Sequence, residues 1–95
     1  MVASRVRVAR RYLINGRVQG VGFRYFTYDA AQRASVSGWV RNLPDRRVEV
    51  EAEADPAALD RFERELRTGP RGAHIDTVDV TELSAGVHSG GFSIR

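Results

Sequence analysis

The chain has 95 residues, of which 42% are hydrophobic and 28% are charged. This length predicts one compact domain, residues 1–95, and the composition is typical of a soluble globular protein, which argues against disorder and against a membrane span. The net charge of +3 comes from basic residues that are all arginine and favours an anionic partner, while the absence of cysteine excludes disulfides, thiolate nucleophiles and sulfur-ligated metals.

The exclusive use of arginine suits phosphate, because the planar guanidinium donates two parallel hydrogen bonds to it. A GC-rich codon usage would give the same composition, and the composition alone does not decide between the two. In the N-terminal stretch Arg5, Arg7, Arg10 and Arg11 interrupt the short apolar runs, so no signal peptide is indicated. We therefore expect a cytoplasmic protein.

The first half of the chain predicts a strand, a helix and a hairpin. Alternating apolar residues indicate a strand over residues 5–15, and apolar residues at helical spacing indicate an amphipathic helix over residues 23–35. Residues 36–43 and 48–54 are typical of strands. The short turn Pro44-Asp45-Arg46 between them predicts an antiparallel pair.

The second half predicts another helix and one or two strands. Asp55 is a suitable N-cap before Pro56, apolar residues at helical spacing predict a buried stripe of Leu59, Phe62 and Leu66, and Gly69-Pro70 ends the helix. Alternation over residues 75–83 indicates a strand, and residues 92–95 could add a short edge strand. The order strand, helix, strand, strand, helix, strand predicts an α+β fold, the ferredoxin-like split βαβ (βαββαβ) sandwich, with an antiparallel sheet and both helices on one face.

The segment between the first strand and the first helix reads GRVQGVGFR over residues 16–24. Gly20 and Gly22 allow positive φ, so successive amide N–H groups can turn toward one point, and the helix N-terminus adds unpaired N–H groups. Such a loop suits phosphate, and Arg24 could neutralise its charge. A solvated arginine beside a surface turn is the plainer interpretation, which the Gly-x-Gly pattern alone does not exclude.

The string GRVQGVGFR resembles the first signature of the acylphosphatase family, and GWVRN over residues 38–42, followed by VEV over residues 48–50, resembles the second. The resemblance covers essentially the whole chain. It implies a ferredoxin-like fold and the hydrolysis of acyl phosphates without a metal or other cofactor. It also implies that Arg24 is the phosphate-binding catalytic arginine and that Asn42 orients the attacking water. The implied phosphate cradle consists of the amides of Gln19, Gly20, Val21, Gly22, Phe23 and Arg24.

The residues are consistent with that chemistry. An acyl phosphate already has a good carboxylate leaving group, so the main tasks are to hold the phosphoryl group, to spread its charge over fixed donors and to place a water. Two residues depart from the family, because Arg46 and Ala54 stand where it usually has glycine. A left-handed Arg46 would cost about 1 kcal/mol, so we expect a different turn geometry there.

Several other residues have plainer interpretations than a functional one. The alternating glutamates of residues 48–54 are expected to form a solvated sheet face, Trp39 is expected to serve packing, and the histidines are expected to be surface or hydrogen-bonded groups without metal. The residues concerned are Glu49, Glu51, Glu53, Trp39, His74 and His88.

Two other functions stay open. A nucleic-acid-binding module would share the basic charge and the ferredoxin-like order, although no strand has the aromatic-rich pattern that stacks bases. A non-catalytic domain of the same family could handle carbamoyl phosphate for a partner. We expect a monomer that acts on a small-molecule acyl phosphate, with no nucleic acid, membrane or metal involved; acetyl, carbamoyl and glyceroyl phosphates all fit.

Overall fold

The computed structural model describes residues 6–95, which form five strands and two helices. In chain order these are β1 (Val8–Arg17), α1 (Phe23–Ala34), β2 (Ser37–Asn42), β3 (Val48–Ala54), α2 (Pro56–Thr68), β4 (His74–Leu83) and β5 (Phe92–Ile94). The predicted order of elements is confirmed, and β5 is the short edge strand. Arg5, where the first strand was expected to begin, lies outside the described residues. Neither described helix is long and apolar enough to cross a membrane.

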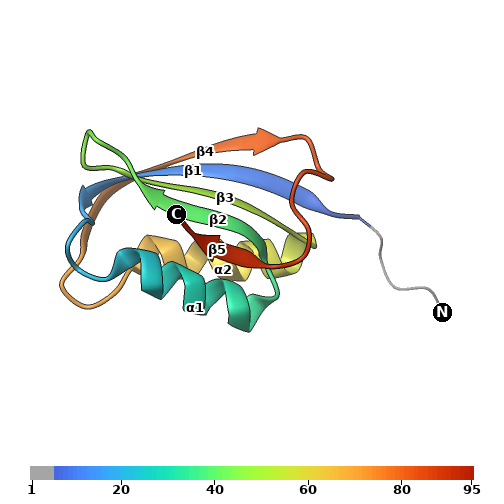
Figure 1. Ribbon diagram of the computed structural model, residues 1–95, viewed down its shortest axis with the longest axis horizontal. Helices are drawn as coiled ribbons and strands as arrows, with labels where there is room; N and C mark the ends of the chain where they lie inside the picture. The colour runs from blue at the N-terminus through green and yellow to red at the C-terminus, as the bar shows by residue number, and fades with distance from the viewer. Residues whose placement is uncertain (1–5) are drawn as a thin grey trace.

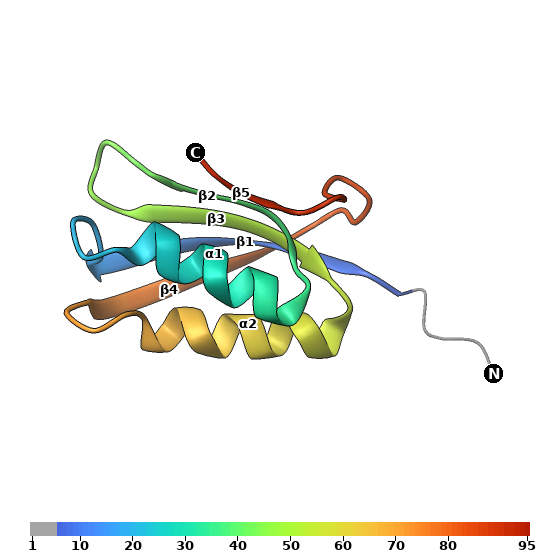
Figure 2. The same ribbon diagram turned by 60° about the horizontal axis from the view of Figure 1, so that its bottom comes forward.

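All five strands belong to one sheet, in the order β4-β1-β3-β2-β5. The four longer strands pair antiparallel, as predicted, but β5 pairs parallel with β2, so the sheet is mixed. Both helices lie side by side on one face of the sheet, as Figure 1 and Figure 2 show. The split βαβ arrangement predicted from the sequence is therefore confirmed, with β3 at the centre of the sheet.

The hydrophobic core lies between the sheet and the two helices. Leu59, Phe62 and Leu66, at the helical spacing seen in the sequence, form the buried stripe of α2. The Phe62 ring meets the ring of Tyr12 in β1 and that of Phe92 in β5, with centroids 6.2 and 6.0 Å apart. These edge contacts attach the short strand β5 to the core, since aromatic pairs of this geometry are favourable.

The helix-free face of the sheet carries buried carboxylates along β3, so the expected solvated face is wrong. Glu49 and Glu53 are only 3% and 1% exposed. Glu49 accepts hydrogen bonds from Arg11 of β1 at 2.5 Å and from Arg41 of β2 at 2.6 Å. Alternation identifies the face on which a side chain lies, but not the long arginine side chains that reach over it from neighbouring strands.

The other two glutamates of β3 hold the loop between β4 and β5. The Glu53 carboxylate accepts hydrogen bonds from the main-chain N–H of Gly86 at 2.7 Å and of His88 at 2.9 Å. The Oε1 atom of Glu51 lies 2.8 Å from the Nε2 atom of His88. This loop is therefore fixed over the outer face of the sheet by charged acceptors, which make stronger hydrogen bonds than neutral ones.

We expect acid to destabilise the fold through Glu49. Burial acts to raise the pKa of Glu49, but the hydrogen bonds from Arg11 and Arg41 outweigh burial and hold the pKa below its ordinary value. Their stabilising effect is therefore fully present above about pH 4.3, the ordinary pKa of glutamate, and is lost as the pH falls through the lower folded-state pKa. Urea unfolding of Glu49→Gln should show a loss of about 1–2 kcal/mol at pH 7.

At pH 3 the same variant should differ less from the parent, because pH 3 lies below the ordinary pKa of glutamate, so the unfolded parent takes up a proton at Glu49 and part of the stabilising effect is lost. Glu82→Gln is a matched control, since Glu82 is exposed on β4 and has no ion-pair partner among the described residues. It should leave the free energy of unfolding within about 0.5 kcal/mol at both pH values. An equal loss for Glu49→Gln at pH 7 and pH 3 would contradict the role given to its charge.

Arg46 takes the left-handed conformation, with φ of 76°, so the expectation of a different turn geometry is wrong. The Arg46 N–H donates to the Leu43 carbonyl at 3.1 Å, and the Leu43 N–H donates to the Arg47 carbonyl at 2.8 Å. A three-residue hairpin loop of this kind needs a left-handed residue at its end to return the chain to register. The sheet pairing on both sides therefore offsets a local cost of about 1 kcal/mol.

Candidate active site

The loop between β1 and α1 has the backbone bend that its glycines predicted. Gly20 and Gly22 have φ of 76° and 80°, in the left-handed region, and an added Cβ at either position would meet only open space. Glycine is therefore required here by backbone conformation and not by close packing. Both glycines also line a small hollow at the surface.

The amides of this loop and of the first helical turn lack protein acceptors. The first helix-type bond runs from the Phe26 N–H to the Gly22 carbonyl at 3.0 Å, and within residues 6–95 no amide of residues 19–25 donates to a protein acceptor. Helix α1 also begins without a side-chain cap and without an acidic residue in its first turn. Unpaired N–H groups and the positive end of the helix dipole thus lie together, an arrangement that attracts anions.

A hollow of about 180 Å³ brings the two predicted catalytic side chains together. Arg24 comes from the first turn of α1 and Asn42 from the end of β2, so residues 18 positions apart in the sequence face one space. The residues that line it are Val18, Gly20, Gly22, Phe23, Arg24, Tyr25 and Asn42. Four residues of the predicted cradle, Gly20, Gly22, Phe23 and Arg24, lie among them.

The remaining two predicted cradle residues lie outside that hollow. The Gln19 side chain donates from Nε2 to the Leu43 carbonyl at 2.8 Å and to the Arg47 carbonyl at 3.0 Å. Val21 is partly buried and packs against the hydrophobic core. The side chain of Gln19 therefore ties the loop to the β2–β3 hairpin, which follows directly after Asn42, and so fixes the two halves of the site relative to each other.

The Arg24 guanidinium is available for an anion. Within residues 6–95 its hydrogen-bond partner is the main-chain oxygen of Arg95, to which Nη1 donates at 3.2 Å, and no aspartate or glutamate side chain pairs with it. The end of β5 therefore lies beside the site, since β5 runs parallel to β2 and the Arg95 N–H bonds the Val40 carbonyl at 2.8 Å. An unpaired arginine next to unpaired amides makes a locally positive hollow.

Sequence reasoning missed Tyr25 as a residue of this hollow. Its side chain is 68% exposed, although it lies in the first turn of α1 and lines the space beside Arg24. The available signal was its position directly after Arg24, because the amides of the first helical turn are unpaired up to the third residue of the helix.

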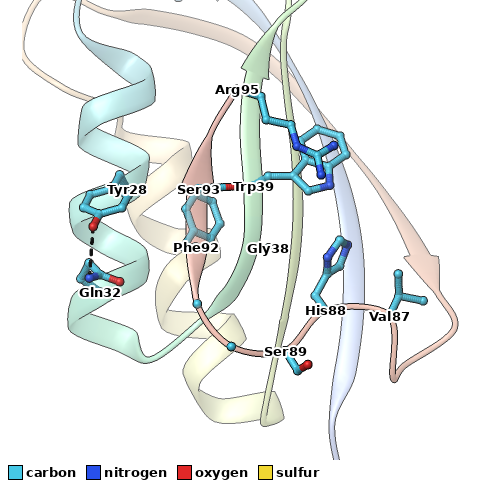
Figure 3. A pocket seen from close by; sticks show the side chains of 12 residues that line it. Tyr28, Gln32, Gly38, Trp39, Val87, His88, Ser89, Phe92, Ser93 and Arg95 are labelled. Atoms are coloured by element: carbon cyan, nitrogen blue, oxygen red, sulfur yellow. Dashed lines mark hydrogen bonds between the residues drawn. The ribbon is translucent and has the colours of Figure 1, made fainter.

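A larger hollow of about 540 Å³ lies at the β5 edge and contains neither Arg24 nor Asn42. Figure 3 shows Trp39 on its wall with the Arg95 side chain stacked over the indole ring. The Arg95 and Arg41 guanidinium carbons lie 4.7 and 5.2 Å from the ring centroid, and Trp39 is only 7% exposed. Trp39 thus packs beneath arginines, as expected for a structural residue.

The two histidines lie apart, and each neighbours a carboxylate. His88 is held by Glu51 as described above, and the exposed His74 lies with its Nε2 3.1 Å from Asp76. Among residues 6–95, no group of three or more histidine, aspartate or glutamate side chains is arranged to hold a metal ion.

Known proteins resemble this chain over nearly its whole length. The family model described as acylphosphatase matches residues 10–94. An acylphosphatase of Anaeromyxobacter dehalogenans is 45% identical over 94% of this chain and 96% of that protein. One from Rubrobacter xylanophilus is 43% identical over 100% of this chain and 86% of that protein. The crystal structure of the acylphosphatase from Bacillus subtilis matches with a TM-score of 0.88 and 39% identity, covering 93% of this chain and 98% of that one.

Proposed function

Because this chain belongs to the acylphosphatase family and is a hydrolase that acts on acyl phosphates, we propose that the hollow shared by Arg24 and Asn42 is its active site. The observation that supports this most is the convergence on one small space of unpaired amides over residues 19–25, an asparagine, and an arginine that pairs with no aspartate or glutamate side chain among residues 6–95. The hollow of about 180 Å³ is large enough for a phosphoryl group, and the acyl group would extend out of it.

The loop and Arg24 bind the phosphoryl group of the substrate. Amide N–H groups at fixed positions donate hydrogen bonds to the phosphoryl oxygens without having to reorganise, and the Arg24 guanidinium adds a charge-assisted pair of hydrogen bonds. Charge that spreads over the equatorial phosphoryl oxygens in the transition state meets the same donors. The main contribution of these groups is therefore electrostatic stabilisation.

Asn42 positions the attacking water. Its carboxamide cannot act as a base near neutral pH, but it can both donate to a water and accept from it, which fixes the direction of the water's lone pair. Holding a nucleophile near the phosphorus atom converts a bimolecular encounter into a positioned one. Asn42 is therefore assigned a role in orientation, not in proton transfer.

The reaction balances without a protein acid or base. The water oxygen forms a bond to phosphorus, the bond between phosphorus and the acyl oxygen breaks, and the carboxylate leaves with that electron pair. A phosphoryl oxygen of the substrate takes the water proton, so the products are a carboxylate and inorganic phosphate. This route requires only the positioning and charge stabilisation described above.

The test is hydrolysis of benzoyl phosphate in the presence of EDTA. We expect turnover that is unchanged by the chelator, because the donors assigned to the phosphoryl group all belong to the protein. We also expect inorganic phosphate to inhibit competitively. Activity that disappears with EDTA and returns with added metal would contradict this assignment. Action as a monomer in the cytoplasm, without nucleic acid, stays a prediction.

A further inference from the structure

A second hollow, of about 490 Å³, lies directly beside the proposed active site. It is lined by Gly16 and Arg17 at the end of β1, by Val18 and Gln19 of the loop, and by Arg46 at the tip of the β2–β3 hairpin. Val18 lines both hollows, so they share a wall. The functions assigned above to the loop, Arg24 and Asn42 make no use of this larger space.

Its two arginines are unpaired. Neither the Arg17 nor the Arg46 side chain has a hydrogen bond or ion pair within residues 6–95, whereas seven other arginines pair with carboxylates. Two neighbouring carboxylates are already engaged, namely Asp45, next to Arg46 in the sequence, and Asp76 of β4, the strand that pairs with the end of β1. Asp45 pairs with Arg47 at 2.8 Å, and this hydrogen bond holds the pKa of Asp45 below its ordinary value. Asp76 pairs with His74, so two uncompensated positive charges face this space.

The hairpin tip that carries Arg46 is held against the loop between β1 and α1 by hydrogen bonds. The Gln19 side chain bonds the carbonyls of Leu43 and Arg47, one on each side of the turn. Arg46 itself stands in a left-handed conformation that glycine would adopt at no steric cost. An arginine at this position therefore places a guanidinium beside the site while adding backbone strain, and its side chain makes no hydrogen bond or ion pair with the described residues that would stabilise the fold.

We propose that this hollow binds a negatively charged acyl group, so that the enzyme favours acyl phosphates whose acyl part carries a second anion, a carboxylate or a phosphate. The inference rests on the proposed function, because it requires the phosphoryl group to occupy the adjoining cradle. Arg17 and Arg46 then receive the distal anion through bidentate hydrogen bonds, the geometry for which guanidinium groups are suited. The acyl group of the substrate bridges the wall at Val18.

The experiment compares 4-carboxybenzoyl phosphate with benzoyl phosphate at low ionic strength. The two substrates share a rigid ring and differ only in the distal carboxylate. Because the ring holds this carboxylate away from the acyl phosphate, it cannot attack that group within the same molecule. We expect a KM roughly threefold to tenfold lower for the carboxylated substrate, the range expected for one or two exposed ion pairs, and a similar kcat. The difference should shrink as salt is added, because salt screens exposed charges.

The test variant is Arg17→Gln combined with Arg46→Gly, and the matched control is Arg64→Gln. Arg64 is exposed on α2, has no ion-pair partner among residues 6–95 and lies outside both hollows. The double variant should hydrolyse both substrates with nearly equal KM while keeping its kcat for benzoyl phosphate. Arg64→Gln should keep the full preference, which separates a local effect from a change in net charge. Arg17→Lys with native Arg46 should keep most of it.

Each outcome decides between the two proposals. If the parent hydrolyses benzoyl phosphate but shows no preference for the carboxylated substrate, or if the double variant keeps the preference, the acyl-anion site is wrong and the proposed function stands. If the parent hydrolyses neither substrate, the proposed function itself fails. A preference lost equally in Arg64→Gln would assign it to net charge and overturn the site.

Discussion

Replacing Arg24 with alanine should lower kcat for benzoyl phosphate by about 10²–10³-fold, the loss expected when one fixed donor to transition-state charge is removed. Inhibition by inorganic phosphate should weaken in the same variant, because the proposed site assigns Arg24 to binding of the phosphoryl group before and during the reaction. The fold should be retained, since among residues 6–95 the guanidinium hydrogen-bonds only the Arg95 main-chain oxygen, at 3.2 Å. Steady-state kinetics, phosphate inhibition and urea unfolding measure these three results.

Arg64→Ala is the matched control for that experiment, because it removes an exposed arginine of α2 that lies outside the hollow and has no ion pair within the described part of the chain. It should keep kcat within about twofold of the parent, in line with the small effects of substitutions away from special features. Arg24→Lys should recover only part of the loss, since an ammonium cannot make a planar bidentate contact. Parent-like kcat in Arg24→Ala would remove this residue from the active site.

Replacing Asn42 with alanine should lower kcat by about 10²-fold or more, because a misplaced water no longer attacks in the productive direction. In contrast to the arginine variant, inhibition by inorganic phosphate should be nearly unchanged, since Asn42 is assigned to the water and the cradle is intact. The two variants thus separate charge stabilisation from water positioning.

Asn15→Ala is the control for the asparagine, as Asn15 is exposed in β1 and lies outside the hollow. Asn42→Asp gives a second comparison of the same size, and its carboxylate should repel the phosphoryl group and reduce both turnover and phosphate binding. An Asn42→Ala protein with the kcat of the parent would show that another group orients the water.

Much of the fold could be predicted from local signals. The stripe of Leu59, Phe62 and Leu66 and the Asp55-Pro56 start defined α2, because helical spacing and end signals are local properties of a sequence. Gly20 and Gly22 predicted the bend that the backbone shows, since positive φ is a requirement that few other residues meet. That Arg24 and Asn42 would lie at one site was predicted from the resemblance to the acylphosphatase family and from the order of the strands.

What the sequence did not predict depends on partners from elsewhere in the chain. Glu49 is buried because arginines of both neighbouring strands cover it, which the alternation of β3 alone cannot show. Arg46 is left-handed because the pairing of β2 with β3 imposes a turn that its own preference opposes. The Gln19 side chain, expected only to contribute an amide, instead ties the loop to the hairpin.

The most direct test of the site is an NMR titration of the ¹⁵N-labelled protein with inorganic phosphate. If the loop amides and Asn42 surround the phosphoryl group, the largest shifts should fall on the main-chain amides of residues 19–25 and on the Asn42 side-chain amide. The signals of the β4–β5 loop, which lies over the outer face of the sheet, should stay in place. Loop amides that do not respond while phosphate still inhibits the enzyme, or largest shifts elsewhere in the protein, would contradict the proposed site.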